Sequence, residues 1–186
     1  MATQTLTKRQ PDASVAKPVP LEVLAGGKPK SPVILALDLG QKTGWALRSR
    51  GGAIASGVQE FRPSRFEGGG MVWLRFRAWL QEVDDTAGAI GTTFFEEVVT
   101  HRGVAASHCY AGFLAHLTAW AEANHVPYTG VPVGTIKRHI AGKGNADKTA
   151  VIAALKMLGF NPADDNEADA LALLHWALAQ GIGGER

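Results

Sequence analysis

Several features on which common classes of protein depend are scarce in this sequence. Its single cysteine, Cys109, excludes an intrachain disulfide. That cysteine stands in an apolar helical pattern, so we expect a packed small side chain rather than a nucleophile. No apolar run is long enough to span a bilayer, and Lys8, Arg9 and Pro11 interrupt the start, where a signal peptide would be apolar. We therefore expect a cytoplasmic protein in a reducing compartment.

Charge of one sign is also scarce, because 19 Lys and Arg stand against 17 Asp and Glu, a formal net charge of +2 over 186 residues. Residues 1–31 hold much of the excess and lack apolar periodicity, so we expect a flexible basic arm that touches polyanions or is simply inert. Residues 32–186 suffice for one domain with a three-layer core. Since that domain is nearly neutral, a nucleic-acid partner would have to meet a local basic patch.

One carboxylate stands where burial makes it costly. The apolar run from Val33 to Leu37 predicts a strand covered on both faces, and Asp38 ends that run. An ionised carboxylate there requires hydrogen bonds or a cation. Turn amides near Gly40 and Gly44 would satisfy it, but a metal ion is the interpretation that we favour.

The remaining pattern predicts an α/β domain with a mixed five-stranded sheet flanked by helices. The first three strands form an antiparallel meander, and the later alternation of strand and helix implies parallel pairing with right-handed crossovers. The expected strands are 33–39, 45–48, 53–61, 92–99 and 126–131, and the expected helices are 71–83, 104–124, 135–140, 147–158 and 164–180.

A second carboxylate lies inside the strand expected over residues 92–99. By the strand period of two, Glu96 shares one face with Phe94 and Val98. A register shifted by one residue would put Glu97 on that face instead. One of these two glutamates is therefore expected beside Asp38.

A third carboxylate lies on the last helix. Asp169 is one helical step from Ala172 and Leu173, on an apolar stripe that should face the sheet, where an unpaired carboxylate is costly. By contrast, Asp164 and Glu167 are explained by a capping box at the start of this helix. We therefore expect a functional role for Asp169 and a structural one for the other two.

Three carboxylates on converging elements favour a hard divalent cation. The sequence has no His or Cys cluster of suitable spacing, so Mg²⁺ or Mn²⁺ is favoured over zinc. Two such ions about 3.5–4 Å apart would clamp the attacking and leaving oxygens of a phosphodiester and lower the pKa of a bound water. Hydrolysis of nucleic acid fits this set of residues.

Four motifs follow one another along the chain: Asp38-Leu-Gly40, Phe95-Glu-Glu-Val98, the stretch Ile136-Lys-Arg-His-Ile-Ala-Gly-Lys-Gly-Asn-Ala-Asp-Lys148, and Ala168-Asp-Ala-Leu-Ala172. In this order and spacing they resemble the RuvC family of Holliday-junction resolvases within the RNase H-like fold. The resemblance runs from about Val33 to the last helix. It implies an RNase H-like fold and a homodimeric endonuclease that resolves four-way DNA junctions in recombination and repair, with two Mg²⁺ ions per site and Mn²⁺ as a substitute.

The same resemblance implies that Asp38, Glu96 and Asp169 are catalytic metal ligands. The family has a fourth acid three residues before the last one, where this sequence has Asn166. Asp165, one residue earlier, falls on the same side of the helix and is the substitute that we favour. Neutral ligation by Asn166 is the alternative.

Contacts to DNA are also implied. By the resemblance, Lys137 and Lys148 bind DNA phosphate or stabilise charge at the scissile group, which suits the compact charge of a lysine. Arg138 and Lys143 lie in the same stretch and extend the expected contact. Arg102, after the Glu96 strand, is a further candidate, with an ordinary solvated loop as the alternative.

Two further departures from the family affect expectations. The usual proline after the first aspartate is Leu39, which should change the turn but not the ligand. The aromatic residue shortly after the catalytic glutamate is Val99, so junction opening or sequence preference should work differently. The last helix is apolar nearly all round, and we expect a twin subunit to cover its second side.

Three rival interpretations stay open. A broader nuclease of the same fold, acting on flaps, forks or RNA–DNA hybrids, would use the same ligands. A junction-binding protein that does not cleave is suggested by Asn166 alone. The segment from Asp38 to Gly44 also resembles the phosphate loop of an actin-like ATPase or sugar kinase, but that class needs two such domains and this chain has length for one.

Overall fold

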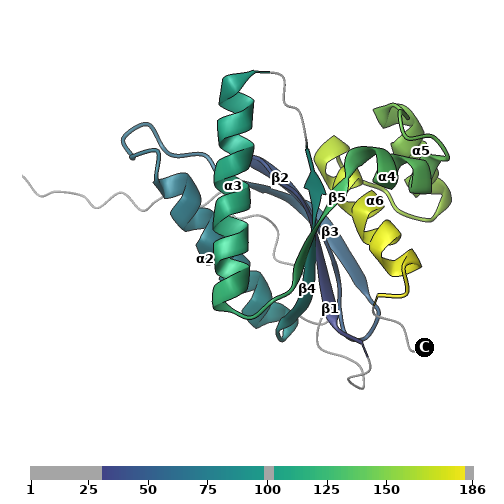
Figure 1. The fold of residues 1–186 in the computed structure, drawn as a ribbon, viewed down its shortest axis with the longest axis horizontal. Coiled ribbons are helices and arrows are strands. Elements are labelled where there is room, and N and C mark those ends of the chain that lie inside the picture. Colours follow the sequence, from purple (N-terminus) through teal and green to yellow (C-terminus); the bar gives the residue numbers. More distant parts are fainter. Residues whose placement is uncertain (1–30, 99–102, 183–186) are drawn as a thin grey trace, which may run out of the picture.

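A five-stranded sheet lies between two layers of helices in the computed structural model (Figure 1). The structure describes residues 31–98 and 103–182, so nearly all of the predicted arm, and the candidate Arg102, lie outside the described residues. The strands are β1 (Val33–Asp38), β2 (Lys42–Arg48), β3 (Ile54–Glu60), β4 (Ile90–Glu97) and β5 (Tyr128–Pro132). The helices are α2 (Met71–Ala87), α3 (Val104–Ala123), α4 (Val133–Ala141), α5 (Lys148–Met157) and α6 (Asp165–Ala179).

The sheet has the strand order β3-β2-β1-β4-β5, with β1 at its centre. The pairs β1–β2 and β2–β3 are antiparallel, and the pairs β1–β4 and β4–β5 are parallel, as the sequence predicts. Strand β2 begins at Lys42 rather than Trp45, because residues 42–44 continue the ladder to β3. The predicted mixed sheet is confirmed.

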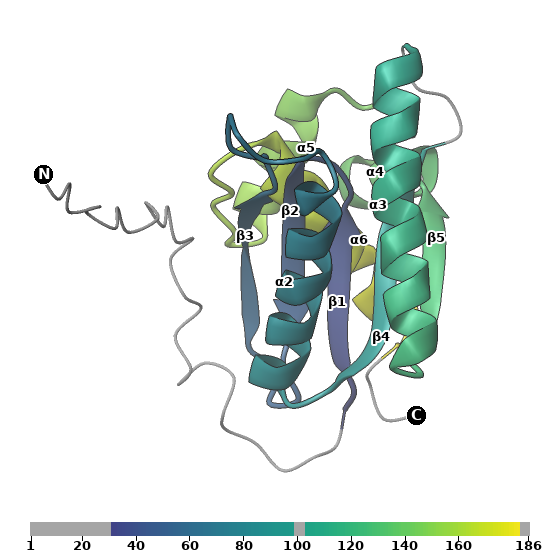
Figure 2. The same cartoon turned by 90° about the vertical axis from the view of Figure 1, so that its left-hand side faces the viewer.

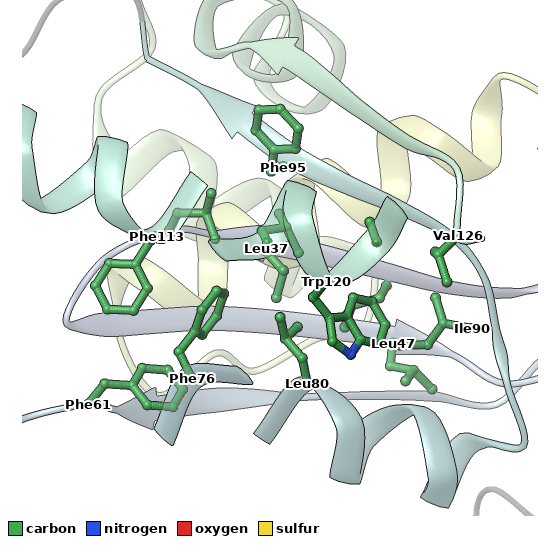
Figure 3. Packing of buried hydrophobic residues seen from close by; sticks show 14 of the residues in the cluster. Leu37, Leu47, Phe61, Phe76, Leu80, Ile90, Phe95, Phe113, Trp120 and Val126 are labelled. Atoms are coloured by element: carbon green, nitrogen blue, oxygen red, sulfur yellow. The ribbon is translucent and has the colours of Figure 1, made fainter. Parts of the chain in front are cut away.

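Alternation along β1 divides the core into two clusters. Leu35 and Leu37 belong to a cluster under α2 and α3, whereas Ile34 and Ala36 belong to a cluster under the remaining helices. Figure 3 shows the first cluster, in which Phe76 and Phe113 pack edge to face with ring centroids 4.9 Å apart. Both faces of β1 are therefore covered, and Asp38, next in the alternation after Ala36, belongs to the face of the second cluster.

Helices α4, α5 and α6 form the layer opposite α2 and α3 (Figures 1 and 2). Helix α6 packs on the sheet, and its Leu171 and Leu174 share the second cluster with Ile136 of α4 and Val151 of α5. The second side of α6 is thus covered within the chain. The expectation that a twin subunit covers this side was wrong, because the short helices α4 and α5 supply the missing apolar surface.

Helix α2 continues to Ala87, beyond the predicted end at Val83. Gly88 ends it in the left-handed region at φ 76°, where its N–H donates to the carbonyl of Asp84. No helix in residues 31–98 or 103–182 has the length and apolar character that crossing a membrane requires.

Candidate active site

Asp38 and Glu96 lie on the same face of the sheet. In the parallel pair of β1 and β4, Leu37 is opposite Phe95, so the two carboxylates are the next residues at the ends of neighbouring strands. Phe94 packs in the cluster under α6 and Phe95 in the opposite one, so Glu96 faces α6. Glu97 faces the other way and is exposed. The alternation therefore favours Glu96 over Glu97 as the neighbour of Asp38.

The turn after Asp38 does not satisfy its carboxylate. The Thr43 hydroxyl donates to the carbonyl of Gly40 at 2.6 Å, and the Gly40 N–H donates weakly to that hydroxyl at 3.4 Å. Within residues 31–98 and 103–182, no side-chain hydrogen bond reaches the Asp38 carboxylate. The turn closes on itself, so the alternative of satisfaction by turn amides is not supported.

Asp169 comes to this face from α6, whose first turn lies directly on β2. A Cβ atom on Gly44 would lie 1.9 Å from the backbone oxygen of Asn166, so only glycine allows this approach. Gly44 is the register partner of Asp38 in the β1–β2 pair. The close approach brings the start of α6 over the end of β1.

The charge of Asp169 acts on both of the other carboxylates, and the charge of Asp38 acts on Glu96. Burial, followed by the charges of Asp169 and Asp165, raises the pKa of Asp38 from 3.8 to about 7. Burial, followed by the charges of Asp38 and Asp169, raises the pKa of Glu96 from 4.5 to about 8. Burial also raises the pKa of Asp169. Burial and neighbouring negative charge thus disfavour the ionised forms of these acids, whereas a bound cation would favour them.

Two predicted lysines supply part of that positive charge. Lys137 of α4 and Lys148 of α5 both act to lower the pKa of Glu96 and Asp169. The Lys148 ammonium also forms an ion pair with Asp165. That contact lowers the pKa of Asp165, and it places the acid beside Lys148 rather than turned away from the site. No contact of the Asn166 side chain is present among the described residues that would favour it as the fourth ligand.

The start of α6 is fixed by contacts that the sequence analysis explained only in part. The Asp164 carboxylate accepts from the Glu167 N–H at 3.0 Å, as in the predicted capping box. Glu167 does not complete that box, because its carboxylate accepts from the Ala163 N–H at 2.7 Å and from the Ser56 hydroxyl of β3 at 2.6 Å. Glu167 is therefore a buried tie between α6 and the sheet.

Lys42 is a residue at this site that the sequence analysis missed. Its ammonium lies 2.5 Å from the Asp164 carboxylate and acts to lower the pKa of Asp165 as well. The predicted antiparallel meander could have indicated this position, because the strand that follows β1 begins beside the end of β1, where Asp38 lies. Lys42 ties β2 to α6 and adds a positive charge beside the acids.

The architecture resembles solved structures. A structure of RuvC from Thermus thermophilus in complex with a Holliday junction substrate superposes with a TM-score of 0.68, at 21% identity, over 82% of this chain and 98% of that one. A second structure of the same organism's RuvC gives a TM-score of 0.63, at 21% identity, over 82% of this chain and 98% of that one. The yeast mitochondrial Holliday junction resolvase Ydc2 gives 0.57, at 12% identity, over 83% and 80% of the two chains.

The chain has the fold of RuvC. The predicted RNase H-like fold is thereby confirmed. No family model matches the sequence, and no curated protein matches it. The roles of individual residues therefore depend on the geometry of this chain.

On this RuvC fold, the donor set fits a hard divalent cation in its chemistry. Carboxylate oxygens from Asp38, Glu96 and Asp169 are the ligands that Mg²⁺ and Mn²⁺ prefer, and a cation would offset the burial that raises the pKa values of these three acids. In the described part of the chain, no three Asp, Glu, His or Cys side chains are already grouped around one point. Ion binding would therefore draw these side chains together.

The remaining predicted DNA contacts lie at the outside of the RuvC fold. Arg138 of α4 and Lys143 of the α4–α5 loop are exposed, and neither is among the charges that shift the pKa values of the acids. The loop packs against α4, because a Cβ atom on Gly144 would lie 3.1 Å from the Gly134 carbonyl and 3.2 Å from the guanidinium of Arg138. These two cations are therefore exposed and do not act on the ionisation of the acids.

Proposed function

We propose that this chain is a metal-dependent, structure-selective endodeoxyribonuclease that resolves four-way DNA junctions by paired hydrolysis of phosphodiesters. One observation carries the proposal: Asp38, Glu96 and Asp169, on three separate elements, are near enough that the charge of Asp169 raises the pKa values of Asp38 and Glu96, and two lysines lower those of Glu96 and Asp169. The likeness to RuvC bound to a Holliday junction substrate and to a yeast resolvase supports the choice of substrate.

In this proposal Asp38, Glu96 and Asp169 hold Mg²⁺, with Asp165 as the fourth ligand. When bound, two Mg²⁺ ions, or Mn²⁺ in their place, would supply positive charge at the scissile phosphate and a lower pKa for the attacking water. Asp38 and Glu96 must lose protons to act as ligands, because their pKa values lie near or above neutrality. Occupancy of the site is therefore expected to rise with pH.

The lysines bind the phosphate. Lys137 and Lys148 lie close enough to the acids to affect their ionisation, so a phosphate held by the acids' metal ions would also be in reach of both ammonium groups. Lys148 would exchange its Asp165 partner for phosphate, which frees that acid as a ligand. Arg138 and Lys143 would contact the backbone further out, which makes affinity strongly dependent on salt.

Resolution of a four-way junction requires recognition of its shape and a cut in each of two strands. We propose that the active form is a homodimer, because a two-fold symmetric junction presents two equivalent strands to two equivalent sites. Backbone contacts carry little sequence information, so arm geometry would select the substrate.

The proposal is tested by cleavage of a labelled synthetic four-way junction beside a linear duplex, a flap and an RNA–DNA hybrid. Each substrate is incubated with Mg²⁺, Mn²⁺ or EDTA. We expect paired nicks in the junction alone, lost in EDTA and in the variants Glu96→Gln and Asp169→Asn. Glu97→Gln is the matched control, because this neighbouring carboxylate is exposed on the other face of β4 and should leave cleavage unchanged.

Other outcomes would change the conclusion in defined ways. Equal cutting of flaps or hybrids would keep the metal site and replace the substrate. Tight binding of the junction without cutting in either metal would make the chain a junction-binding protein. Loss of cutting in Glu97→Gln but not in Glu96→Gln would contradict the assignment of faces.

A further inference from the structure

The loop between β3 and α2, residues 61–70, leaves the sheet at the edge where the acids lie. Strands β1 and β3 both run antiparallel to β2, so both end at the same edge. Lys42 pairs with Glu60 at the end of β3, and the next N–H, of Phe61, donates to the Gln41 carbonyl at 2.8 Å. Figure 2 shows this loop at the upper end of the molecule, the same end as the start of α6.

Polar contacts hold this loop in one shape. The Glu67 carboxylate accepts from the Ser64 N–H at 2.8 Å and pairs with Arg75 of α2 at 2.6 Å. The same arginine donates to the carbonyl of Arg62 at 2.9 Å. Phe61, at the start of the loop, is fully buried in the core. Both sides of the loop are therefore tied to the folded domain.

The tip of this ordered loop carries an exposed aromatic ring. Phe66 is 92% exposed, although a phenylalanine gains free energy by burial. The guanidinium of Arg65 lies over its ring at 5.8 Å from the centroid. In the part of the chain that the structure describes, Arg65 has no carboxylate partner, and Arg62 has only a loose one, Glu60, at 3.8 Å. An exposed ring flanked by cations is a surface suited to a partner that offers both flat apolar faces and negative charge.

Nucleic acid with accessible bases is the partner that fits this chemistry. Aromatic side chains stack on base faces without regard to sequence, and neighbouring cations bind the phosphates. Continuous duplex hides its base faces, whereas a branch point exposes them. A second copy of this chain would bury the Phe66 ring but would bring the like charges of Arg62 and Arg65 in the two copies together.

We propose that the β3–α2 loop is a second DNA contact, in which Phe66 stacks on a base exposed at the branch point while Arg65 and Arg62 bind the flanking phosphates. This inference rests on the proposed function and deepens it. DNA would lie across the end of the sheet, with its scissile phosphate on the α6 side and an exposed base at the loop on the α2 side. Selectivity for branched DNA then comes in part from Phe66.

The test measures the affinity of the full chain for a fluorescent four-way junction and for a linear duplex, with Ca²⁺ in place of Mg²⁺ to prevent cutting. Phe66→Ala should weaken junction binding by roughly 5- to 150-fold and leave duplex binding nearly unchanged, since stacking of one base is lost. Phe66→Trp should restore junction binding. Arg65→Gln should weaken both complexes and reduce the slope of log affinity against log salt by about one.

Met157→Ala is the matched control, because Met157 is an equally exposed apolar side chain, at 90%, at the far end of α5. It should bind both DNAs as the wild type does. Wild-type junction affinity in Phe66→Ala, with cleavage intact, overturns this inference alone. So does a change in the oligomeric state of Phe66→Ala with unchanged DNA affinity, which would assign the ring to a second copy. If the wild type neither binds the junction more tightly than the duplex nor cuts it, the result contradicts the proposed function and this inference together.

Discussion

Replacing Asp38 by Asn should stabilise the metal-free protein at high pH. The pKa of Asp38 is raised by burial and by Asp169 and Asp165, so the folded state holds a proton that the unfolded state has already lost above pH 3.8. Stability therefore falls as pH rises from about 4 to about 7 and then stays low. Asn is neutral and nearly isosteric, so Asp38→Asn lacks this loss.

The magnitude follows from the size of the pKa change. A rise from 3.8 to about 7 corresponds to roughly 4 kcal/mol once both states are deprotonated. The variant should thus match the wild type near pH 4 and exceed it by up to about 4 kcal/mol at pH 8. With roughly 2–4 °C per kcal/mol for a chain of this size, the difference in Tm at pH 8 is about 8–16 °C. Asp38→Asn should also lower the pKa of Glu96, because the charge of Asp38 is the second cause of its rise.

Thermal and urea unfolding in EDTA, followed by circular dichroism from pH 4 to pH 8, measure this difference. Glu97→Gln is the control and should follow the wild type. Addition of Mg²⁺ at pH 8 should raise the Tm of the wild type more than that of Asp38→Asn, because binding to the folded state adds stability. A variant whose stability falls with pH as steeply as the wild type's would refute the buried, coupled acid site.

Three further substitutions test the supports of the site. Gly44→Ala should lower the free energy of unfolding by at least about 1–3 kcal/mol and abolish cleavage, because its Cβ would lie 1.9 Å from the Asn166 backbone. Gly40→Ala is the control in the same urea titration and should lose little stability, because its Cβ would have no neighbour nearer than 3.9 Å. Ser56→Ala should lower the free energy of unfolding by about 1.5–3 kcal/mol, because it removes the hydroxyl that donates to Glu167. An unchanged urea midpoint would contradict a stabilising role of this hydrogen bond. Lys148→Gln should reduce single-turnover cleavage by roughly 10²-fold or more while leaving Tm nearly unchanged; Lys156→Gln, at the exposed end of the same helix, is its control.

The sheet and the helices could be predicted because their local patterns agree with their tertiary surroundings. The run from Val33 to Leu37 is apolar without alternation, and it became the central strand with both faces covered. The helix over Val104–Ala123 ends within one residue of its predicted bounds. Boundaries failed where pairing decided them, as at Lys42, since the ladder to β3 is a property of two strands and not of the local sequence.

The second side of α6 shows a different limit. An apolar helix surface predicts that something covers it, but not what does. The residues that do so, such as Ile136 and Val151, belong to two short helices whose presence could be predicted from the sequence, but not their packing against α6. The homodimer therefore stays a prediction that no longer has support from α6.

The acids could be predicted because a carboxylate at the end of an apolar run is anomalous in isolation, whereas their supports are ordinary residues until the chain folds. Gly44, Ser56 and Lys42 have nothing in their local sequence that links them to residues 163–167. Yet these three contacts hold the start of α6, the helix that carries Asp169, against β2 and β3. Burial is the largest cause of the raised pKa values of Asp38 and Asp169, and these contacts hold α6 where it keeps the acids buried. Loss of one of these contacts should therefore weaken metal binding even when every acid is retained.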